Sequence, residues 1–515
     1  MLARVLLEKT NNLVLTMTKI GSCCVSMSLG QMFEESCRRY TDNVCIIYDG
    51  TYLTYEVFNR YVNALANGLR NLGIQKGDKV AVMLPNCPEF VISYFAIQKI
   101  GAVAVTLNIL STSYELRYLL ANSDSKCLIT ETPLAKRYEE IREDIPLCSK
   151  IITCSGLETD SPFNDIIERG PFSLEMPEIV DDDPAVIIYT AGLTGKPLGA
   201  VLTHRNLLSQ SDLLGNVYHA TEKYRGLAVI PLFHAFGAVV NMLGAIRIGA
   251  GIVLLDRVTM DAIFSTVEKE RVTYIAAVPR LFLGMIMHRE ADKYDMSSLD
   301  FCITGGSTMP PEFIPKFEEK FKVILREGYG LTEASPVCSV GMRDMVHKPG
   351  SIGTVIPGVE AKIVDEQGNE VPRGEIGELV IRGENVMKGY YKDNEATTRV
   401  IRNGWLYTSD LARIDEDGYI FLKGLKKRMI ITSGFNVYPQ EVEQILGLHP
   451  AVKASIVVGE PNLLRGEIVK ALIVRNPDVL VTERDITRHC RTYLSSYKVP
   501  RAVEFVESLD AQRSS

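Results

Sequence analysis

Apolar and polar positions along the chain alternate between the pattern of a buried strand and the pattern of a helix. The continuous apolar run "KVAVML" (79–84) is typical of a strand buried on both faces, whereas "EFVISYFAIQKIGAV" (89–103) has the length and spacing of a helix. A strand "AVTLN" (104–108), a helix "SYELRYLLANS" (113–123) and a strand "KCLIT" (126–130) follow. Because strand–helix–strand connections are right-handed, this order predicts a mostly parallel sheet.

The alternation continues through the middle of the chain and then stops. Apolar runs at 251–256, 272–279 and 301–306 repeat the pattern of buried strands. From about Gly353, short alternating strands are separated by Gly, Pro and Asn turns, which predicts a small β-barrel or sheet. After Gly424, short strands and the helical segment "TERDITRHCRTYLSSY" predict a compact α+β unit.

These patterns predict an α/β protein of two domains, since 515 residues are too many for one core. Residues 28–423 would form a large, multi-subdomain N-terminal domain with parallel-rich sheets and the small β-barrel. Residues 424–515 would form the small C-terminal domain, which we expect to be truncated. Residues 1–27 are treated as an extension of uncertain order. Glu8 and Lys9 interrupt the apolar run of this extension before a signal-peptide core can form.

The composition of the chain limits the classes of partner and the cellular compartment that we expect. A net charge of −7 offers no basic surplus for neutralising phosphates, which argues against nucleic acid as a partner. Eleven cysteines without a C-x-x-C pair indicate neither a disulfide framework nor a zinc site, and they favour a cytoplasmic protein. No apolar run reaches the roughly 18 residues of a transmembrane helix. Contact with a membrane surface and oligomer formation both stay open.

The stretch "YTAGLTGKPLGA" (189–200) follows the apolar run "AVII" and has features of a phosphate-binding loop. Its three glycines free the backbone to present N–H groups to an anion, and its two threonines add hydroxyl donors. It is not a P-loop, because only two residues separate its first two glycines and proline follows its lysine. Taken alone, the stretch favours a glycine-rich turn between two strands over a nucleotide site.

Later segments change this interpretation. With them, the chain from about Ser28 onward resembles the adenylate-forming superfamily, and within it the fatty acid–CoA ligases. The resemblance lies in six segments in the family's order: the loop at 189–200, "PLFHAFG" (231–237), "GYGLTE" (328–333), "GELVIRGENVMKGYY" (377–391), "GWLYTSDLA" (404–412) and "ITSGFNVYPQEVE" (431–443). It implies that ATP and a fatty acid give an acyl-adenylate and pyrophosphate, after which coenzyme A takes the acyl group.

The resemblance also implies residue roles, with ATP, Mg²⁺ and coenzyme A as ligands. Glu333 matches the family's Mg²⁺ ligand, a hard oxygen donor for a hard cation. Thr332 matches the hydroxyl that bonds the α-phosphate, and Asp410 matches the carboxylate that accepts both ribose hydroxyls. The remaining matches contact the adenine or the phosphates: Tyr329 (stacked on the base), Gly305, Gly306, Ser307, Gly328 and Gly330 around it, and Thr190, Gly192, Thr194, Gly195 and Lys196 in the loop.

Three further positions concern the acyl group and the small domain. His234 matches a position where the acyl carboxylate and the thiol tunnel meet. Ala235 replaces an Asp that pairs with an ammonium group in amino-acid-activating relatives, so the resemblance implies an uncharged acyl tail. Lys427 matches the hinge about which a mobile C-terminal domain rotates, and Gly434 belongs to the loop used in thioester formation.

The chain departs from the family's pattern where it would contact phosphates. Ala191 and Leu193 replace hydroxyl residues, and Leu198 and Leu425 replace a lysine and an arginine of the family. Ser409 stands where Gly is usual, and the family's C-terminal lysine would come at about the residue after Ser515. Each lost charge-assisted bond costs about 1.5–3 kcal/mol, so we expect adenylation to be weaker than thioester formation.

Two alternatives to a fatty acid–CoA ligase remain open. One is a non-catalytic or thioesterification-only protein that binds acyl-adenylates, in keeping with the altered loop. The other is an enzyme that loads the acyl group onto a carrier protein instead of coenzyme A.

Overall fold

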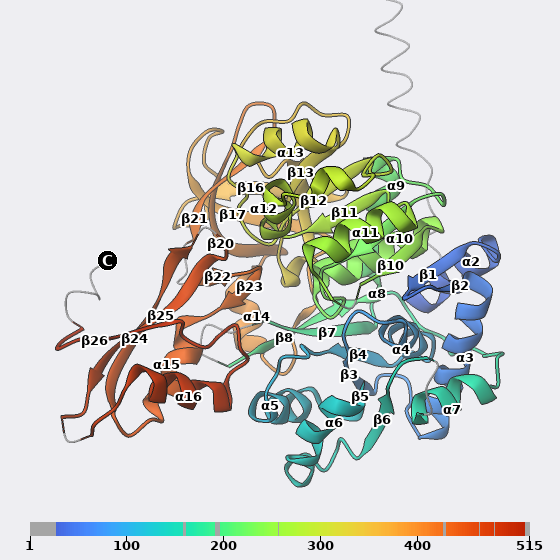
Figure 1. Cartoon of the computed structure of the whole chain (residues 1–515), viewed down its shortest axis with the longest axis horizontal. Helices are drawn as coiled ribbons and strands as arrows, with labels where there is room; N and C mark the ends of the chain where they lie inside the picture. Colours follow the sequence, from blue (N-terminus) through green and yellow to red (C-terminus); the bar gives the residue numbers. More distant parts are fainter. Residues whose placement is uncertain are drawn as a thin grey trace, which may run out of the picture.

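The computed structural model of the protein describes residues 27–157, 161–190, 196–255, 257–425, 429–462, 464–477 and 479–509. Figure 1 shows a large N-terminal domain and a smaller C-terminal domain, in orange and red, at its left side. The predicted α/β class and the division into a large and a small domain are confirmed.

A seven-stranded sheet forms the lower half of the large domain. Its order is β18-β8-β7-β4-β3-β5-β6, and the pairs among β3 to β7 are parallel. The strands are β3 (Lys79–Met83), β4 (Val103–Thr106), β5 (Ser125–Glu131), β6 (Lys150–Cys154), β7 (Pro184–Thr190), β8 (Leu198–Thr203) and β18 (Gly389–Tyr390). Strand β8 runs antiparallel to β7.

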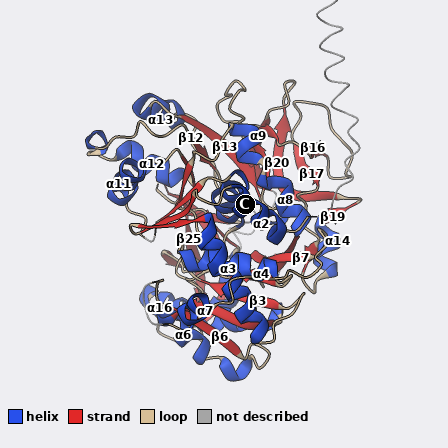
Figure 2. Ribbon diagram, turned by 90° about the vertical axis from the view of Figure 1, so that its right-hand side faces the viewer, coloured by secondary structure: helices blue, strands red, loops and turns tan. Residues whose placement is uncertain are grey.

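Helices bury both faces of this sheet, which is why its strands read as continuous apolar runs. Val80 and Val82 of β3 face one core, and Ala81 and Met83 face another on the opposite side. Figure 2 shows helices gathered around these strands. The helices of this half are α2 (Leu29–Arg39), α3 (Tyr55–Asn71), α4 (Pro88–Lys99), α5 (Ser113–Ser123), α6 (Thr132–Glu139), α7 (Pro162–Arg169) and α8 (His204–Ser211).

A nine-stranded sheet forms the upper half, in the order β15-β14-β13-β12-β11-β9-β10-β1-β2. Its strands are β1 (Val44–Tyr48), β2 (Thr51–Thr54), β9 (Arg225–Ala228), β10 (Gly251–Leu254), β11 (Tyr274–Ala277), β12 (Phe301–Thr304), β13 (Ile324–Gly330), β14 (Val337–Val340) and β15 (Thr354–Val355). The helices are α9 (Leu213–Tyr218), the π-helix Gly237–Leu243, α10 (Gly244–Ile248), α11 (Met260–Glu270), α12 (Pro279–Met287) and α13 (Phe313–Phe321).

Two smaller sheets complete the chain. The predicted short strands after Gly353 form an antiparallel sheet, which contains β16 (Val359–Val364), β17 (Gly377–Gly383), β19 (Ile401–Arg402), β20 (Trp405–Ile414) and β21 (Ile420–Leu425), with α14 (Asn394–Val400) nearby. The small domain contains β22 (Ile430–Thr432), β23 (Phe435–Val437), β24 (Val452–Asn462), β25 (Gly466–Arg475), β26 (Ala502–Phe505), α15 (Pro439–Gly447) and α16 (Glu483–Tyr493).

Most predicted elements lie where the sequence pattern put them, and the exceptions have local causes. Helix α5 spans the predicted residues 113–123. The predicted helix 89–103 is four residues too long at its C-terminal end, because Gly101 has φ = 71° and turns the chain into β4. The division predicted at residue 424 falls inside β21 and stays a prediction; the next strand, β22, belongs to a different sheet.

A helix that crosses a bilayer must be long and apolar. Among the helices of the described residues, none combines the length and hydropathy that a crossing requires. The predicted extension up to residue 26 lies outside the described residues.

Candidate active site

A cavity of about 850 Å³ opens where the carboxyl ends of three strands meet the small domain. Thr190 ends β7, Gly305 follows β12, and Tyr329 and Gly330 end β13, and all four line the cavity. Carboxyl ends of parallel strands are the usual place for ligands in open α/β sheets. The cavity therefore brings together most of the site residues predicted from the sequence.

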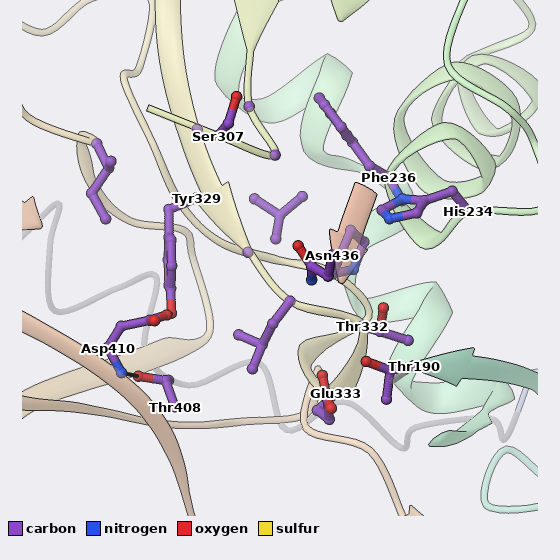
Figure 3. Close-up of a pocket in the computed structure, with 18 of the residues that line it drawn as sticks. Thr190, His234, Phe236, Ser307, Tyr329, Thr332, Glu333, Thr408, Asp410 and Asn436 are labelled. Carbon is purple, nitrogen blue, oxygen red and sulfur yellow. Dashed lines mark hydrogen bonds between the residues drawn. The ribbon is translucent and has the colours of Figure 1, made fainter. Parts of the chain in front are cut away.

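At one end of the cavity, Tyr329 and Asp410 form a hydrogen-bonded pair. The Tyr329 hydroxyl donates to Oδ2 of Asp410, and the Asp410 backbone N–H donates to the Thr408 hydroxyl at 3.1 Å (Figure 3). Burial, and then the charge of Asp410, raise the pKa of the Tyr329 hydroxyl well above its usual range, so it remains a donor. The pair holds the Asp410 carboxylate beside the aromatic ring, where it can accept hydroxyl groups of a ligand.

Thr190, Thr332 and Glu333 lie together at another end of the cavity (Figure 3). The Tyr390 hydroxyl donates to Oε1 of Glu333 at 2.7 Å, which fixes the carboxylate from the side of β18. The end of β13, just before Thr332, needs glycine, because a Cβ at Gly330 would lie 2.0 Å from the carbonyl oxygen of Pro336. Two hydroxyls and an oriented carboxylate are suited to phosphate oxygens and a hard cation.

His234 lines the cavity as a neutral imidazole. Burial lowers its pKa to about 4, and the Phe236 backbone N–H donates to its Nδ1 at 3.2 Å. Since Nδ1 accepts, the ring proton of the neutral form lies on Nε2. His234 can therefore donate one hydrogen bond to a carboxylate or carbonyl oxygen in the cavity.

The wall between β12 and β13 leaves room because it is built from small residues. Gly305, Gly306, Ser307 and Gly328 all line the cavity. A Cβ at Gly328 would lie in ordinary contact with Val340, Ser339 and Ile303, at 3.4 to 3.7 Å, so a small side chain would fit there and a large one would have to enter the cavity. The cavity is also lined by a group of apolar side chains that we call the apolar branch: Leu214, Val217, Tyr218, Val240, Ile303 and Val340.

The small domain closes the cavity with the loop after β22. Gly434 has φ = 86°, and a Cβ there would lie 2.6 Å from Cγ1 of Val278 in the large domain. Both features require glycine at this close approach. Asn436 and Tyr438 of the same segment also line the cavity.

Acidic side chains outnumber basic ones on the described part of the cavity wall. Six carboxylates and two cations line it: Glu327, Glu333, Asp393, Glu395, Asp410 and Glu467 against Arg399 and Lys423. Arg399 is itself paired with Glu395. A polyanionic ligand would therefore need a cation that accompanies it.

The phosphate-side predictions have mixed outcomes. Lys196 is exposed and is absent from the described residues on the cavity wall, whereas Leu198 lines the cavity. The predicted site residues Gly192, Thr194, Gly195 and Lys427 lie outside the described residues, so their roles stay predictions. Thr190 ends β7 and Leu198 begins β8, and both line the cavity.

Ala235 does not support the argument that the sequence suggested. Its side chain is fully buried in the large-domain core, and its neighbours His234 and Phe236 face the cavity instead. Alternation along this segment explains the difference, because a residue between two cavity-facing ones points into the core. The choice between amino acids and other acids must rest on the apolar branch.

The sequence analysis did not single out several further cavity residues, among them Glu327, Tyr390, Thr408, Asn436 and Tyr438. All but Glu327 lie inside segments that carried the resemblance, so adjacency to a matched residue was the available signal. Glu327 is different, because only its burial makes it unusual. Burial raises the pKa of this carboxyl to about 7.

Comparison with known proteins adds independent information. The pattern of the family described as AMP-binding enzyme matches residues 33–391, and that of the AMP-binding enzyme C-terminal domain matches residues 441–515. A long-chain-fatty-acid–CoA ligase of Bacillus subtilis (strain 168) is 33% identical over 514 residues, covering 94% of this chain and 91% of the relative.

Two solved structures show the same fold in different degrees of superposition. A double mutant of o-succinylbenzoate CoA synthetase (MenE) from Bacillus subtilis, bound with its product analogue OSB-NCoA, has a TM-score of 0.84 at 26% identity and covers 94% of this chain and 95% of its own. ATP-bound MatB from Rhodopseudomonas palustris has a TM-score of 0.73 at 28% identity, with coverage of 94% and 95%.

Proposed function

Because the chain belongs to the AMP-binding enzyme family and is an AMP-forming ligase, we propose that it joins a fatty acid to coenzyme A through an acyl-adenylate. The family predicted from the sequence is thereby confirmed, and the identity of the acid is the proposal. One observation carries it: a single cavity is lined by the Tyr329–Asp410 pair, the Glu333 carboxylate and the apolar branch.

In this proposal the Tyr329 end holds the nucleoside. The aromatic ring would stack on adenine, with Gly305, Gly306 and Ser307 beside the base. The Asp410 carboxylate would exchange its bond from Tyr329 for bonds from the ribose hydroxyls. Such charge-assisted bonds are about twice as strong as neutral ones, so this contact dominates nucleoside affinity.

The Thr332–Glu333 end would hold the phosphates together with Mg²⁺. Among the described residues no group of three His, Cys, Asp or Glu side chains forms a metal cage. Mg²⁺ does not need one, since it commonly takes one carboxylate and the oxygens of substrate phosphates. Glu333 fits that use, and the cation would offset the excess of carboxylates on the wall.

The apolar branch would take the acyl tail. It is lined by aliphatic side chains and by Tyr218, whose hydroxyl is bound to the carbonyl of Gly341 and is thus satisfied. Burying a CH₂ group there contributes about 0.8 kcal/mol, which favours aliphatic acids over charged ones. The neutral His234 would donate to an oxygen of the acid's carboxyl group.

An arginine cluster supports coenzyme A as the thiol. Arg280 of the large domain and Arg465 of the small domain both donate to the Ser433 hydroxyl at 3.3 Å, directly beside Gly434. Burial, then Arg501 and Arg280, lower the pKa of Arg465, so the three positive charges are close together. Phosphate groups on coenzyme A would neutralise the three arginine charges beside Gly434. This favours coenzyme A over a carrier protein as the acceptor of the acyl group.

A reducing compartment such as the cytoplasm belongs to the same proposal. The nine cysteines of the described residues are all buried and free. Buried thiols would stay reduced without any structural disulfide to preserve.

The test is pyrophosphate release with ATP, Mg²⁺ and a series of eight- to sixteen-carbon acids, with and without coenzyme A. We expect release with aliphatic acids and thioester only when the thiol is present. Gly328→Trp should move the preference toward shorter acids, because its side chain would fill the apolar branch. Release with amino acids as fast as with octanoate would contradict the substrate class, and no release at all would favour a non-catalytic binding protein.

A further inference from the structure

A buried cluster of charged side chains joins the two domains at a distance from the residues discussed so far. Lys498 of the small domain contacts Glu115 of α5 in the large domain at 2.8 Å. It also contacts Glu441 of α15, in its own domain, at 2.6 Å. The three side chains are only 8–10% exposed, and Figure 1 shows α16 beside α5 at this junction.

Glu115 is held firmly from both sides of the junction. Within the large domain it accepts the Thr112 backbone N–H at 2.9 Å, as part of the capping box of α5. From the small domain it accepts the Ser495 hydroxyl at 2.5 Å in addition to Lys498. The Thr112 hydroxyl in turn donates to the carbonyl of Tyr493 at 2.9 Å. Burial raises the pKa of Glu115, but these donors outweigh it and keep the pKa below its usual value.

Separation of the two domains would affect the carboxylates of Glu115 and Glu441 differently. Glu441 travels with Lys498 on the small domain, so the lysine keeps one partner. Glu115 stays on the large domain, where separation exposes it to water. A buried charge left without any partner is strongly unfavourable, and this arrangement avoids that outcome for both ions. The Glu115–Lys498 contact can therefore form and break reversibly.

The junction is also connected to the cavity through neighbouring rings. Tyr497, next to Lys498, stacks on Phe435 with ring centroids 4.5 Å apart. Phe435 lies between the cavity residues Gly434 and Asn436, and it packs against the large-domain core. Holding Lys498 against α5 thus holds the segment 434–438 over the cavity.

We propose that the Glu115–Lys498 contact is a domain latch that positions the segment 434–438 for transfer of the acyl group to the thiol. The inference rests on the proposed function, because it assigns the latched arrangement to one of its two steps. The assignment follows from Gly434, which the resemblance places in the loop used in thioester formation, and from Arg280 and Arg465 beside it. Lys498 and Glu115 act through this segment and are positioning residues.

The test compares Glu115→Gln with Glu441→Gln. Each variant removes one negative charge from Lys498, but only Glu115 crosses the domain boundary. Glutamine at 115 keeps an acceptor for the capping box, so α5 should remain folded. Thioester formation from synthetic acyl-adenylate and coenzyme A should fall about tenfold in Glu115→Gln, whereas pyrophosphate release from ATP and the acid should not fall. Glu441→Gln should leave the ratio of the two rates unchanged.

Hydrogen exchange measures the latch without relying on catalysis. Amides of residues 113–117 and 493–498 should lose protection in Glu115→Gln and keep it in Glu441→Gln. If both variants lowered both rates equally, or if exchange at the junction did not change in Glu115→Gln, the latch would be overturned. An inactive wild-type protein with the predicted exchange pattern would instead reject the proposed function and retain the domain contact.

Discussion

The two ends of the nucleotide side of the cavity differ in how they are equipped. At the nucleoside end, Tyr329 and Asp410 form a complete pair with an oriented carboxylate. At the phosphate end, Leu198 occupies a wall position where the resembled family carries lysine, and Lys196 is exposed and absent from the described residues of the wall. The difference teaches that binding a nucleoside and reacting at its phosphates are separate demands, and this chain meets the first more fully.

The largest expected effect comes from removing the nucleoside contact. Asp410→Ala should lose two charge-assisted bonds to ribose at about 1.5–3 kcal/mol each, which weakens AMP binding about a hundredfold or more. The rise in melting temperature on adding AMP should nearly vanish. Asp292→Ala, at an exposed carboxylate of the same domain, is the control. An undiminished shift in Asp410→Ala would reject the ribose site and the comparison with it.

A second prediction concerns Glu327, whose buried carboxyl has its pKa raised from 4.5 to about 7. Between these values the unfolded chain releases this proton and the folded protein keeps it, so stability falls as pH rises through this window. Glu327→Gln removes the effect. Relative to wild type, it should gain up to about 3 kcal/mol at about pH 8 and nothing at about pH 4. Denaturant unfolding at both pH values measures this, and a pH-independent difference would show that the pKa of this carboxyl is the same in the folded protein and the unfolded chain.

Leu198→Lys addresses the phosphate end directly. A lysine at this wall position should contact phosphate oxygens and raise the rate of pyrophosphate release about tenfold. Thioester formation from synthetic acyl-adenylate should not change, because that step has no pyrophosphate to neutralise. Leu198→Met serves as the control for side-chain length. Equal rates in all three proteins would mean that another cation already serves this end.

The smallest effect is expected beside Asp410. Ser409 has φ = 63°, a left-handed conformation that costs a non-glycine residue roughly 1 kcal/mol. Ser409→Gly should therefore raise the free energy of unfolding by up to about 1 kcal/mol and leave AMP affinity nearly constant. A loss of stability would indicate that the serine side chain makes a compensating contact.

Much of the fold followed from the hydrophobic pattern, because both-face burial produces continuous apolar strands. The bounds of α5 were predicted well since its capping box is local. The end of α4 was not, because it depends on the conformation of Gly101.

The site divides in the same way. Tyr329, Glu333 and Asp410 were placed by matching short segments, and the cavity does bring them together. Glu327 was missed because its raised pKa comes from burial, which no local pattern encodes. The contact between Glu115 and Lys498 joins residues 383 positions apart, so sequence spacing could not indicate it. Ala235 was misread because the match gave its neighbours but not the direction of its side chain.

The most direct test of the account compares the two half-reactions in the unaltered protein. One arm measures acyl-adenylate formation from ATP, Mg²⁺ and a fatty acid in a single turnover. The other measures thioester formation from the synthetic acyl-adenylate and coenzyme A. We predict that the second rate is far above the first, because the phosphate end has Leu198 where the resembled family carries a lysine, and only the first step must neutralise charge on pyrophosphate. Equal rates, or faster adenylation, would contradict the account.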